Sequence, residues 1–106
     1  MSSKEPESNS EVILLTGDLD MAAVDVFRDR IRGAFSPGDL IIDLGGVGFM
    51  DSSGLSALLV AHVDCEKSGT RLFLRNVPPR LQRLLELAGL NDVLNIIIGD
   101  VEAQPG

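Results

Sequence analysis

Four segments of the chain are rich in apolar residues, and the three segments between them carry apolar residues at helical spacing. The apolar segments are residues 11–16, 39–44, 70–75 and 93–98. Short apolar runs that are bounded by turn residues are typical of buried β-strands. The pattern therefore predicts four strands that alternate with three helices.

The residues at the helix ends support this assignment. The first helix is expected to begin after Asp20, a residue type that caps helices by accepting backbone N–H bonds, and to end at residues 36–38 (Ser-Pro-Gly). The second is expected to cover residues 52–67. The third opens with the two prolines at 78–79 and is expected to end at Gly89, a favoured C-terminal cap.

The order βαβαβαβ with short links predicts an α/β domain with a mainly parallel four-stranded sheet packed with helices. This domain is expected to span residues 11–101. Residues 1–10 are polar and Ser-rich and are expected to form a disordered tail, and residues 102–106 a second tail. A fifth strand in the first tail is the alternative, but its composition argues against one. Sites in parallel sheets gather at the carboxyl ends of the strands, so the connections at 17–20 and 45–53 are expected to be neighbours there.

The composition narrows the possible partners. The 106 residues, 44% of them apolar, suffice for one domain with a small core. The net charge of −7 repels phosphate backbones and anionic membranes, and the absence of Trp and Tyr leaves little for base stacking. No apolar run approaches the ~20 residues that span a bilayer, and the N-terminus does not resemble a signal peptide. We expect a cytoplasmic protein that binds neither nucleic acid nor membrane.

Catalytic and metal chemistry are limited by a single Cys and a single His. Cys65 cannot form an internal disulfide and is expected in the core of the second helix. His62 lies ten residues from Ser52 on that helix, roughly 15 Å along the axis, which excludes a Ser–His pair within one chain. One His and one Cys are a poor metal site. No catalytic residue, metal ligand or cofactor is predicted.

Two other features suggest a site for phosphate chemistry, but each lacks residues that such a site needs. The glycines within residues 45–48 lie between a strand and a helix, but neither G-x-x-x-x-G-K-[ST] nor G-x-G-x-x-G is present, so we interpret them as a flexible turn. Asp43 near a strand end suggests a phosphoaspartate receiver. Such a site usually needs several carboxylates for Mg²⁺ and a nearby lysine, and the only lysines are Lys4 and Lys67.

The segment Phe49-Met50-Asp51-Ser52-Ser53-Gly54-Leu55 puts two hydroxyls beside an aspartate at a helix N-terminus. Unpaired N–H groups and roughly +0.5 of a charge make such an end suitable for a phosphate, although ordinary helix capping explains the same residues. Gly54 is a poor helix former that would let another protein approach. The helix face of Leu55, Leu58, Leu59 and Val63 is more apolar than a small sheet requires, so part of it is available to a partner.

Three segments resemble the STAS domain of anti-sigma factor antagonists: FMDSSGL after a strand, TGDLD before the first helix, and the late AGLNDVLNI. The resemblance covers about residues 11–100. It implies that Ser52 is phosphorylated by a partner that is both an anti-sigma factor and a serine kinase. The unphosphorylated antagonist would capture this kinase and free the sigma factor, and a PP2C-type, metal-dependent serine phosphatase would restore it. The chain would then be a binding protein and not an enzyme.

The resemblance also implies a partner-binding surface around this serine. Its members are Asp20, Asp51, Ser52, Ser53, Gly54, Leu55 and Ser56. The chain departs from the family in two ways: the family often has glycine where this chain has Ser56, and often has an extra N-terminal strand. Ser56 lies on the same helix face as Ser52, where it could bond a phosphate or crowd a docking partner. Two other functions stay open, a STAS scaffold or subunit of a lipid- or anion-transport system and a small-ligand sensor.

Overall fold

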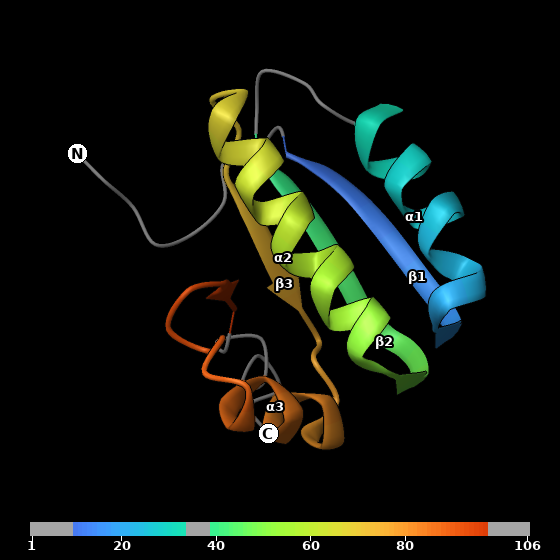
Figure 1. Cartoon of the computed structure of the whole chain (residues 1–106). Coiled ribbons are helices and arrows are strands. Elements are labelled where there is room, and N and C mark those ends of the chain that lie inside the picture. Colours follow the sequence, from blue (N-terminus) through green and yellow to red (C-terminus); the bar gives the residue numbers. More distant parts are fainter. Residues whose placement is uncertain (1–9, 34–38, 98–106) are drawn as a thin grey trace, which may run out of the picture.

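The computed structural model describes residues 10–33 and 39–97, which form one parallel sheet and three helices (Figure 1). The strands are β1 (Glu11–Leu19), β2 (Leu40–Met50), β3 (Leu72–Arg75) and β4 (Asn95–Ile96). The helices are α1 (Met21–Gly33), α2 (Ser52–Lys67) and α3 (Pro79–Leu87). The sheet order is β1-β2-β3-β4 and each neighbouring pair is parallel, which confirms the predicted α/β class. The two predicted tails lie outside the described residues, apart from Ser10.

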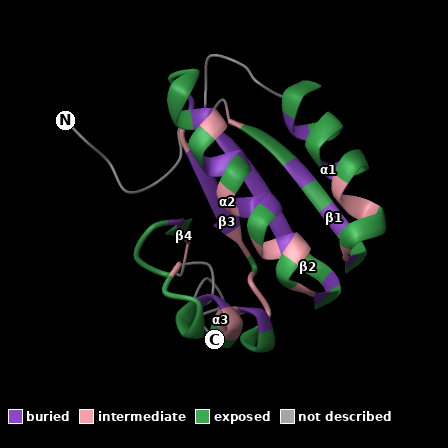
Figure 2. Cartoon of the chain, in the orientation of Figure 1, coloured by how far each residue is buried: buried purple, intermediate pink, exposed green. Residues whose placement is uncertain are grey.

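Helices α1 and α2 lie side by side over one face of the sheet (Figure 1). Alternate residues of β2 and β3 point at this helical layer, because successive side chains of a strand face opposite ways. The fully buried ones are Leu40, Ile42, Leu44, Leu72 and Leu74. Figure 2 shows buried residues gathered along β2, β3 and the inner faces of the two helices. The core therefore sits between the sheet and the α1–α2 layer.

Strands β1 and β2 are longer than the sequence indicated, and the glycine segment 45–48 belongs to β2, so the predicted turn is wrong. Leu14 pairs with Asp43 but Thr16 with Gly46, so β2 contains an extra residue at this point. A Cβ on Gly46 would lie 2.8 Å from the Cγ2 atom of Thr16. Glycine is required here because the two strands approach closely at a bulge.

The last two strands are shorter than predicted. Strand β3 begins at Leu72 rather than at residue 70, and β4 covers only Asn95–Ile96. Leu94 lies in a turn, in which its N–H donates to the carbonyl of Leu90 at 2.9 Å. Local turn hydrogen bonds therefore replace the ladder that an extended segment 93–98 would need. Ile98 and the predicted end of the first helix at 36–38 lie outside the described residues.

The predicted end of α3 is confirmed. Gly89 has φ +75°, its N–H donates to Glu86 O at 3.0 Å, and the N–H of Leu90 donates to Leu85 O at 2.9 Å. These two bonds are the Schellman arrangement that satisfies the last carbonyls of a helix.

The lone Cys and His occupy the positions that the sequence predicts. Cys65 is fully buried, and burial, with a smaller contribution from Asp64, raises the pKa of its thiol to about 11. The thiol is therefore protonated at neutral pH and belongs to the core. His62 is also buried, with Nε2 3.5 Å from a carboxylate oxygen of Glu66 on the same helix. It lies far from Ser52 at the other end of α2.

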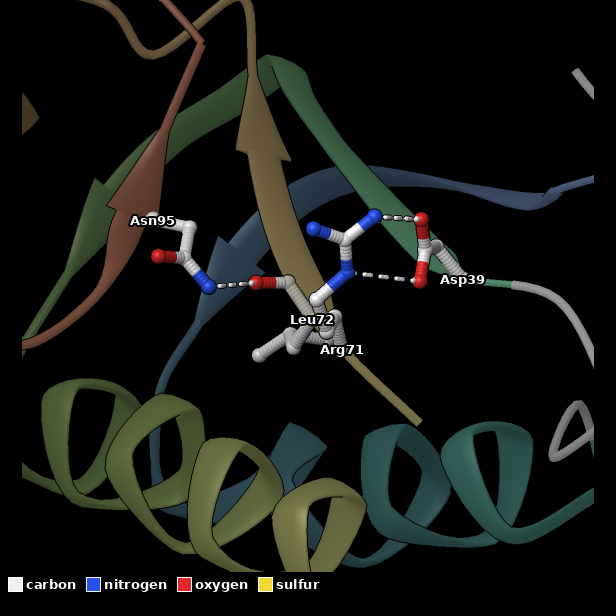
Figure 3. Close-up of polar contacts among 4 residues, drawn as sticks. All are labelled: Asp39, Arg71, Leu72 and Asn95. Carbon is white, nitrogen blue, oxygen red and sulfur yellow. Dashed lines mark hydrogen bonds and ion pairs between the residues drawn. The ribbon is translucent and has the colours of Figure 1, made fainter. Parts of the chain in front are cut away.

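The sheet face that points away from the helical layer carries two Asp–Arg pairs between β2 and β3. Arg71 binds Asp39 through two hydrogen bonds of 3.1 and 2.8 Å (Figure 3). Asp43 pairs with Arg75, four residues further along both strands, at 2.9 Å. Together the pairs fix the register of β2 against β3.

Three residues donate hydrogen bonds to the carboxylate of Asp43, which gives it a structural role in place of receiver chemistry. Oδ1 accepts the N–H of Gly45 at 2.9 Å, and Oδ2 accepts from Arg75 Nε at 3.0 Å and from Asn76 Nδ2 at 2.9 Å. Burial alone would raise the pKa of Asp43. The bonds from Gly45, Arg75 and Asn76, with the charge of Arg75, outweigh burial and lower this pKa below 3.8.

Replacing Asp43 by Asn should lower the free energy of unfolding at pH 7 by about 1–3 kcal/mol, because Arg75 loses its ionic partner. A lowered native pKa gives stability that is present above the unfolded-state pKa of 3.8 and lost as the pH falls through the native pKa. The free energy of unfolding, measured in urea, should therefore differ less between wild type and Asp43→Asn below about pH 4 than at pH 7. Asp29→Asn, at an exposed position, is the control. A difference that does not change with pH would contradict this role.

The first turn of α2 rests directly on the end of β1 at Gly54. A Cβ at this position would lie 2.4 Å from the carbonyl oxygen of Leu19 and 2.7 Å from Cγ of Met50. Both distances are too short for any side chain, so only glycine permits the contact. This differs from the expected reason for Gly54: its own β1, rather than a partner, makes the close approach.

Gly54→Ala should destabilise the protein by about 1–3 kcal/mol through overpacking, although alanine is the better helix former. Gly33→Ala is the matched control, since Gly33 also lies in a helix and its added Cβ would meet nothing within 4 Å. The measurement is urea unfolding of both variants. Equal stability of the two variants would show that the Leu19 contact is not a constraint.

Candidate functional site

Ser52 is the first residue of α2 and lies at the carboxyl end of β2, where sites in parallel sheets gather. Its side chain is exposed and makes no hydrogen bond within residues 10–33 and 39–97. The hydroxyl is therefore accessible to another protein, as a modification site requires.

Asp51 caps α2 and already occupies its N-terminus. Its Oδ1 accepts the N–H groups of Ser53 and Gly54 at 2.9 and 3.1 Å, and its backbone carbonyl accepts that of Leu55 at 3.1 Å. These bonds confirm ordinary helix capping, the alternative that the sequence left open, because a carboxylate of the chain binds the N–H groups of Ser53 and Gly54 that a phosphate would use. A phosphate on Ser52 would instead lie beside a fixed negative charge.

Asp20 plays the same role for α1. Its Oδ1 accepts the N–H of Ala23 at 3.2 Å. Leu19 and Met50 are register partners at the ends of β1 and β2, so the two capping aspartates, Asp20 and Asp51, follow paired residues. This confirms that the segments 17–20 and 45–53 are neighbours, although most of both segments is strand.

Beside Ser52, a hollow of about 470 Å³ separates the first turns of α1 and α2. Its lining consists of Met21, Val24, Asp25, Arg28, Ser52, Ser53, Ser56, Ala57 and Val60. Three hydroxyls thus share one hollow, and Ser56 borders the same space as Ser52, as its helical spacing predicts.

The seven residues of the predicted partner surface differ in accessibility. Ser52 and Ser56 are exposed, Asp20, Asp51, Ser53 and Leu55 are half-buried, and Gly54 is buried. Leu55 packs against the hydrophobic core, as does the fully buried Leu58. The helix face that the sequence offered to a partner is therefore partly core, and the part of the surface that a partner reaches most readily is the pair of serines.

Two residues that line the hollow, Met21 (75% exposed) and Arg28, are missing from the predicted partner surface. Phe49, also missing from it, is 52% exposed, does not line the hollow, and pairs with Asp18 at the end of β2, three residues before Ser52 in the chain. Phe49 was missed because β2 was expected to end at Leu44. In a longer strand, a large apolar residue next to the buried Met50 points outward, which was the available signal.

The described part of the chain contains no group of three or more His, Cys, Asp or Glu side chains that could hold a metal ion. In the same residues, no helix has the length and hydropathy of a membrane span.

Known proteins resemble this chain in sequence and in fold. The family model described as Mlab, STAS domain matches residues 2–98. The anti-sigma-B factor antagonist of Bacillus subtilis (strain 168) is 33% identical over 94 residues, which cover 88% of this chain and 85% of that protein.

Solved structures show the same fold. The anti-sigma factor antagonist SpoIIAA in its unphosphorylated form superposes with a TM-score of 0.69 at 26% identity, with 96% of both chains covered. Its phosphorylated form, from Bacillus, gives 0.63 at 26% identity, with 95% of this chain and 96% of that chain covered. A sulfate transporter family protein from Wolinella succinogenes gives 0.70 at 26% identity, with 85% and 77% covered. As its resemblance predicted, the chain belongs to the STAS domain family.

Proposed function

We propose that this protein is a cytoplasmic, non-enzymatic anti-sigma factor antagonist that is switched by phosphorylation of Ser52. In the unphosphorylated state it binds an anti-sigma factor that has serine kinase activity, and the sigma factor is released. A PP2C-type phosphatase removes the phosphate and restores binding. The relatives named as anti-sigma factor antagonists, and the SpoIIAA structures in unphosphorylated and phosphorylated forms, support the proposal.

The observation that carries the proposal is the position of Ser52 next to Asp51. The hydroxyl is exposed and free of hydrogen bonds within the described residues, whereas the Asp51 carboxylate is fixed by two backbone N–H groups. Modification of Ser52 therefore leaves the cap of α2 intact. The fold should tolerate the phosphate while the surface changes.

The charge of the phosphate explains how docking would be lost. Phosphorylation adds about −1.5 to −2 charges. A partner carboxylate ~6 Å away would be repelled by about 3 kcal/mol per unit charge at an effective dielectric constant near 20. Even part of this repulsion, with the steric bulk of the phosphate, reduces affinity by on the order of a hundredfold. Because the Asp51 carboxylate already binds the N–H groups of Ser53 and Gly54, these two groups do not compensate the charge of the phosphate.

Exposed apolar side chains near Ser52 supply the attraction in the unphosphorylated state. Met21 and Phe49 are 75% and 52% exposed, and the polar Ser56 shares the hollow with Ser52. Apolar anchors within a polar rim are the usual composition of protein–protein interfaces. A phosphate placed among these residues would interrupt such an interface near its centre.

A STAS component of a transport system is the second candidate, supported by the likeness to the sulfate transporter family protein. The small-ligand sensor is less favoured, because Asp51 occupies two N–H groups that a nucleotide phosphate would use. Purification of the protein with its native partners separates the first two functions. An anti-sigma factor among these partners supports the antagonist, whereas a transporter would favour the alternative.

Incubation of the protein with its cognate anti-sigma kinase and ATP should add one phosphate. Ser52→Ala should abolish the labelling, because it removes the exposed acceptor. Ser56→Ala is the matched control, four residues away on the same hollow, and should be labelled like wild type. Intact-protein mass spectrometry is the readout. Undiminished labelling of Ser52→Ala would contradict the assignment of this serine.

Ser52→Asp should weaken binding of the purified anti-sigma factor, and phosphorylation itself should weaken it by on the order of a hundredfold. Ser52→Ala should bind like the unphosphorylated wild type. All forms should keep a native circular dichroism spectrum, because the Asp51 cap does not involve the hydroxyl. Isothermal titration calorimetry measures the affinities. If Ser52→Asp and the phosphorylated protein both bind with wild-type affinity, the proposed phosphorylation switch is contradicted.

A further inference from the structure

A second hollow of about 230 Å³ lies next to the one beside Ser52 along the α1–α2 boundary. This second hollow, which we call the basic hollow, is lined by Arg28, Ile31, Arg32, Val60, Ala61, Asp64, Lys67 and Ser68. Arg28 and Val60 line both hollows, so the two are adjacent, and we call the pair the groove.

The chemistry of the basic hollow differs from that of the chain as a whole. Ile31 and Ala61 are buried at its base, and Val60 is 44% exposed. The charged residues that line it are three cations, Arg28, Arg32 and Lys67, and one carboxylate, Asp64. The protein as a whole has a net charge of −7. An apolar base with an excess of positive charge suits an acidic side chain that is accompanied by an apolar one.

Within the described part of the chain, the three cations of the basic hollow make fewer or weaker bonds than Arg30, Arg71 and Arg75 do. Arg71 and Arg75 are paired with buried aspartates, and Arg30 donates to the carbonyl of Leu14 at 3.0 Å. Arg32 and Lys67 are exposed and form no ion pair within the described residues. The nearest carboxylate recorded for Arg28 is that of Asp25 at 3.9 Å, and the Asp25 side chain is 92% exposed. Such a loose pair contributes little.

We propose that the basic hollow binds an acidic segment of the same protein that docks at Ser52, with a partner carboxylate among Arg28, Arg32 and Lys67. Two observations favour this occupant: the excess of positive charge in the basic hollow, and its position next to the hollow beside Ser52, with which it shares Arg28 and Val60. This inference rests on the proposed function and extends its interface along the groove.

The distance between the two ends of the groove has a consequence for regulation. Lys67 lies fifteen residues after Ser52 on α2, roughly 22 Å along the helix axis. This exceeds the Debye length of ~8 Å at physiological ionic strength. The Lys67 end of the basic hollow therefore contributes affinity that a phosphate on Ser52 does not cancel electrostatically, whereas Arg28 borders the Ser52 hollow as well. The effects of changes at Ser52 and at Lys67 should multiply.

Charge reversal tests the proposal. Arg32→Glu and Lys67→Glu should each weaken binding of the purified cognate anti-sigma factor about fivefold or more at low ionic strength, and less at high ionic strength. Arg80→Glu and Arg83→Glu, at exposed positions of α3, are matched controls and should change affinity less than about twofold. In the Ser52→Asp background, Lys67→Glu should reduce the affinity for the anti-sigma factor by the same factor as it does in wild type.

Cross-linking gives a direct readout. A zero-length carbodiimide reagent should join the Lys67 amine to a partner carboxylate, and peptide mass spectrometry identifies both residues. Lys67→Arg should keep the affinity and lose this cross-link. The other lysine, Lys4, serves as a reference for nonspecific reaction.

The outcomes separate this inference from the proposed function. If wild type binds the anti-sigma factor but reversal at Arg32 or Lys67 acts like reversal at Arg80 or Arg83, the basic hollow is not part of the interface. Sedimentation of the protein alone reports its oligomeric state. If Arg32→Glu or Lys67→Glu changes the sedimentation coefficient in the absence of the anti-sigma factor, the occupant of the basic hollow is a second copy of this chain, and the proposal is overturned. Failure of wild type to bind at all would contradict the proposed function itself.

Discussion

The contact of the first turn of α2 with the end of β1 is the constraint on which the site depends. Gly54 lies against the carbonyl of Leu19, and Asp51 fixes the N–H groups of Ser53 and Gly54. These interactions set where α2 begins and leave Ser52 outward, next to a held carboxylate. Because neither interaction uses the serine hydroxyl, the surface can change its charge while the core stays the same.

The sequence predicted the element order, the parallel sheet and the junction at Ser52, because apolar runs and capping residues are local signals. It did not predict the length of β1 and β2, since the glycines at 45–48 are equally compatible with a turn and with a bulged strand. It also assigned Gly54 to partner access, because a backbone contact between segments 35 residues apart leaves no trace in local spacing.

The site itself was predicted as a set of residues but not as a surface. Ser52 and Ser56 were expected on one face and do line one hollow. Arg28 and Met21 were not expected there, because their position depends on how α1 packs beside α2 and not on their own segment. Capping is a local matter, and the sequence left two interpretations of this helix end open; the hydrogen bonds of Asp51 show that two of its N–H groups are already bound.

We therefore expect a charge at Ser52 to control docking without altering the fold. Amide NMR spectra recorded while the anti-sigma factor is titrated into the unphosphorylated and the Ser52-phosphorylated protein measure both effects at once. Without phosphate, signals from the first turns of α1 and α2 should shift on titration. With phosphate, these signals should stay in place, and the signals of the sheet should match those of the unphosphorylated protein. Equal titration of both forms, or displaced sheet signals throughout the phosphorylated protein, would contradict this expectation.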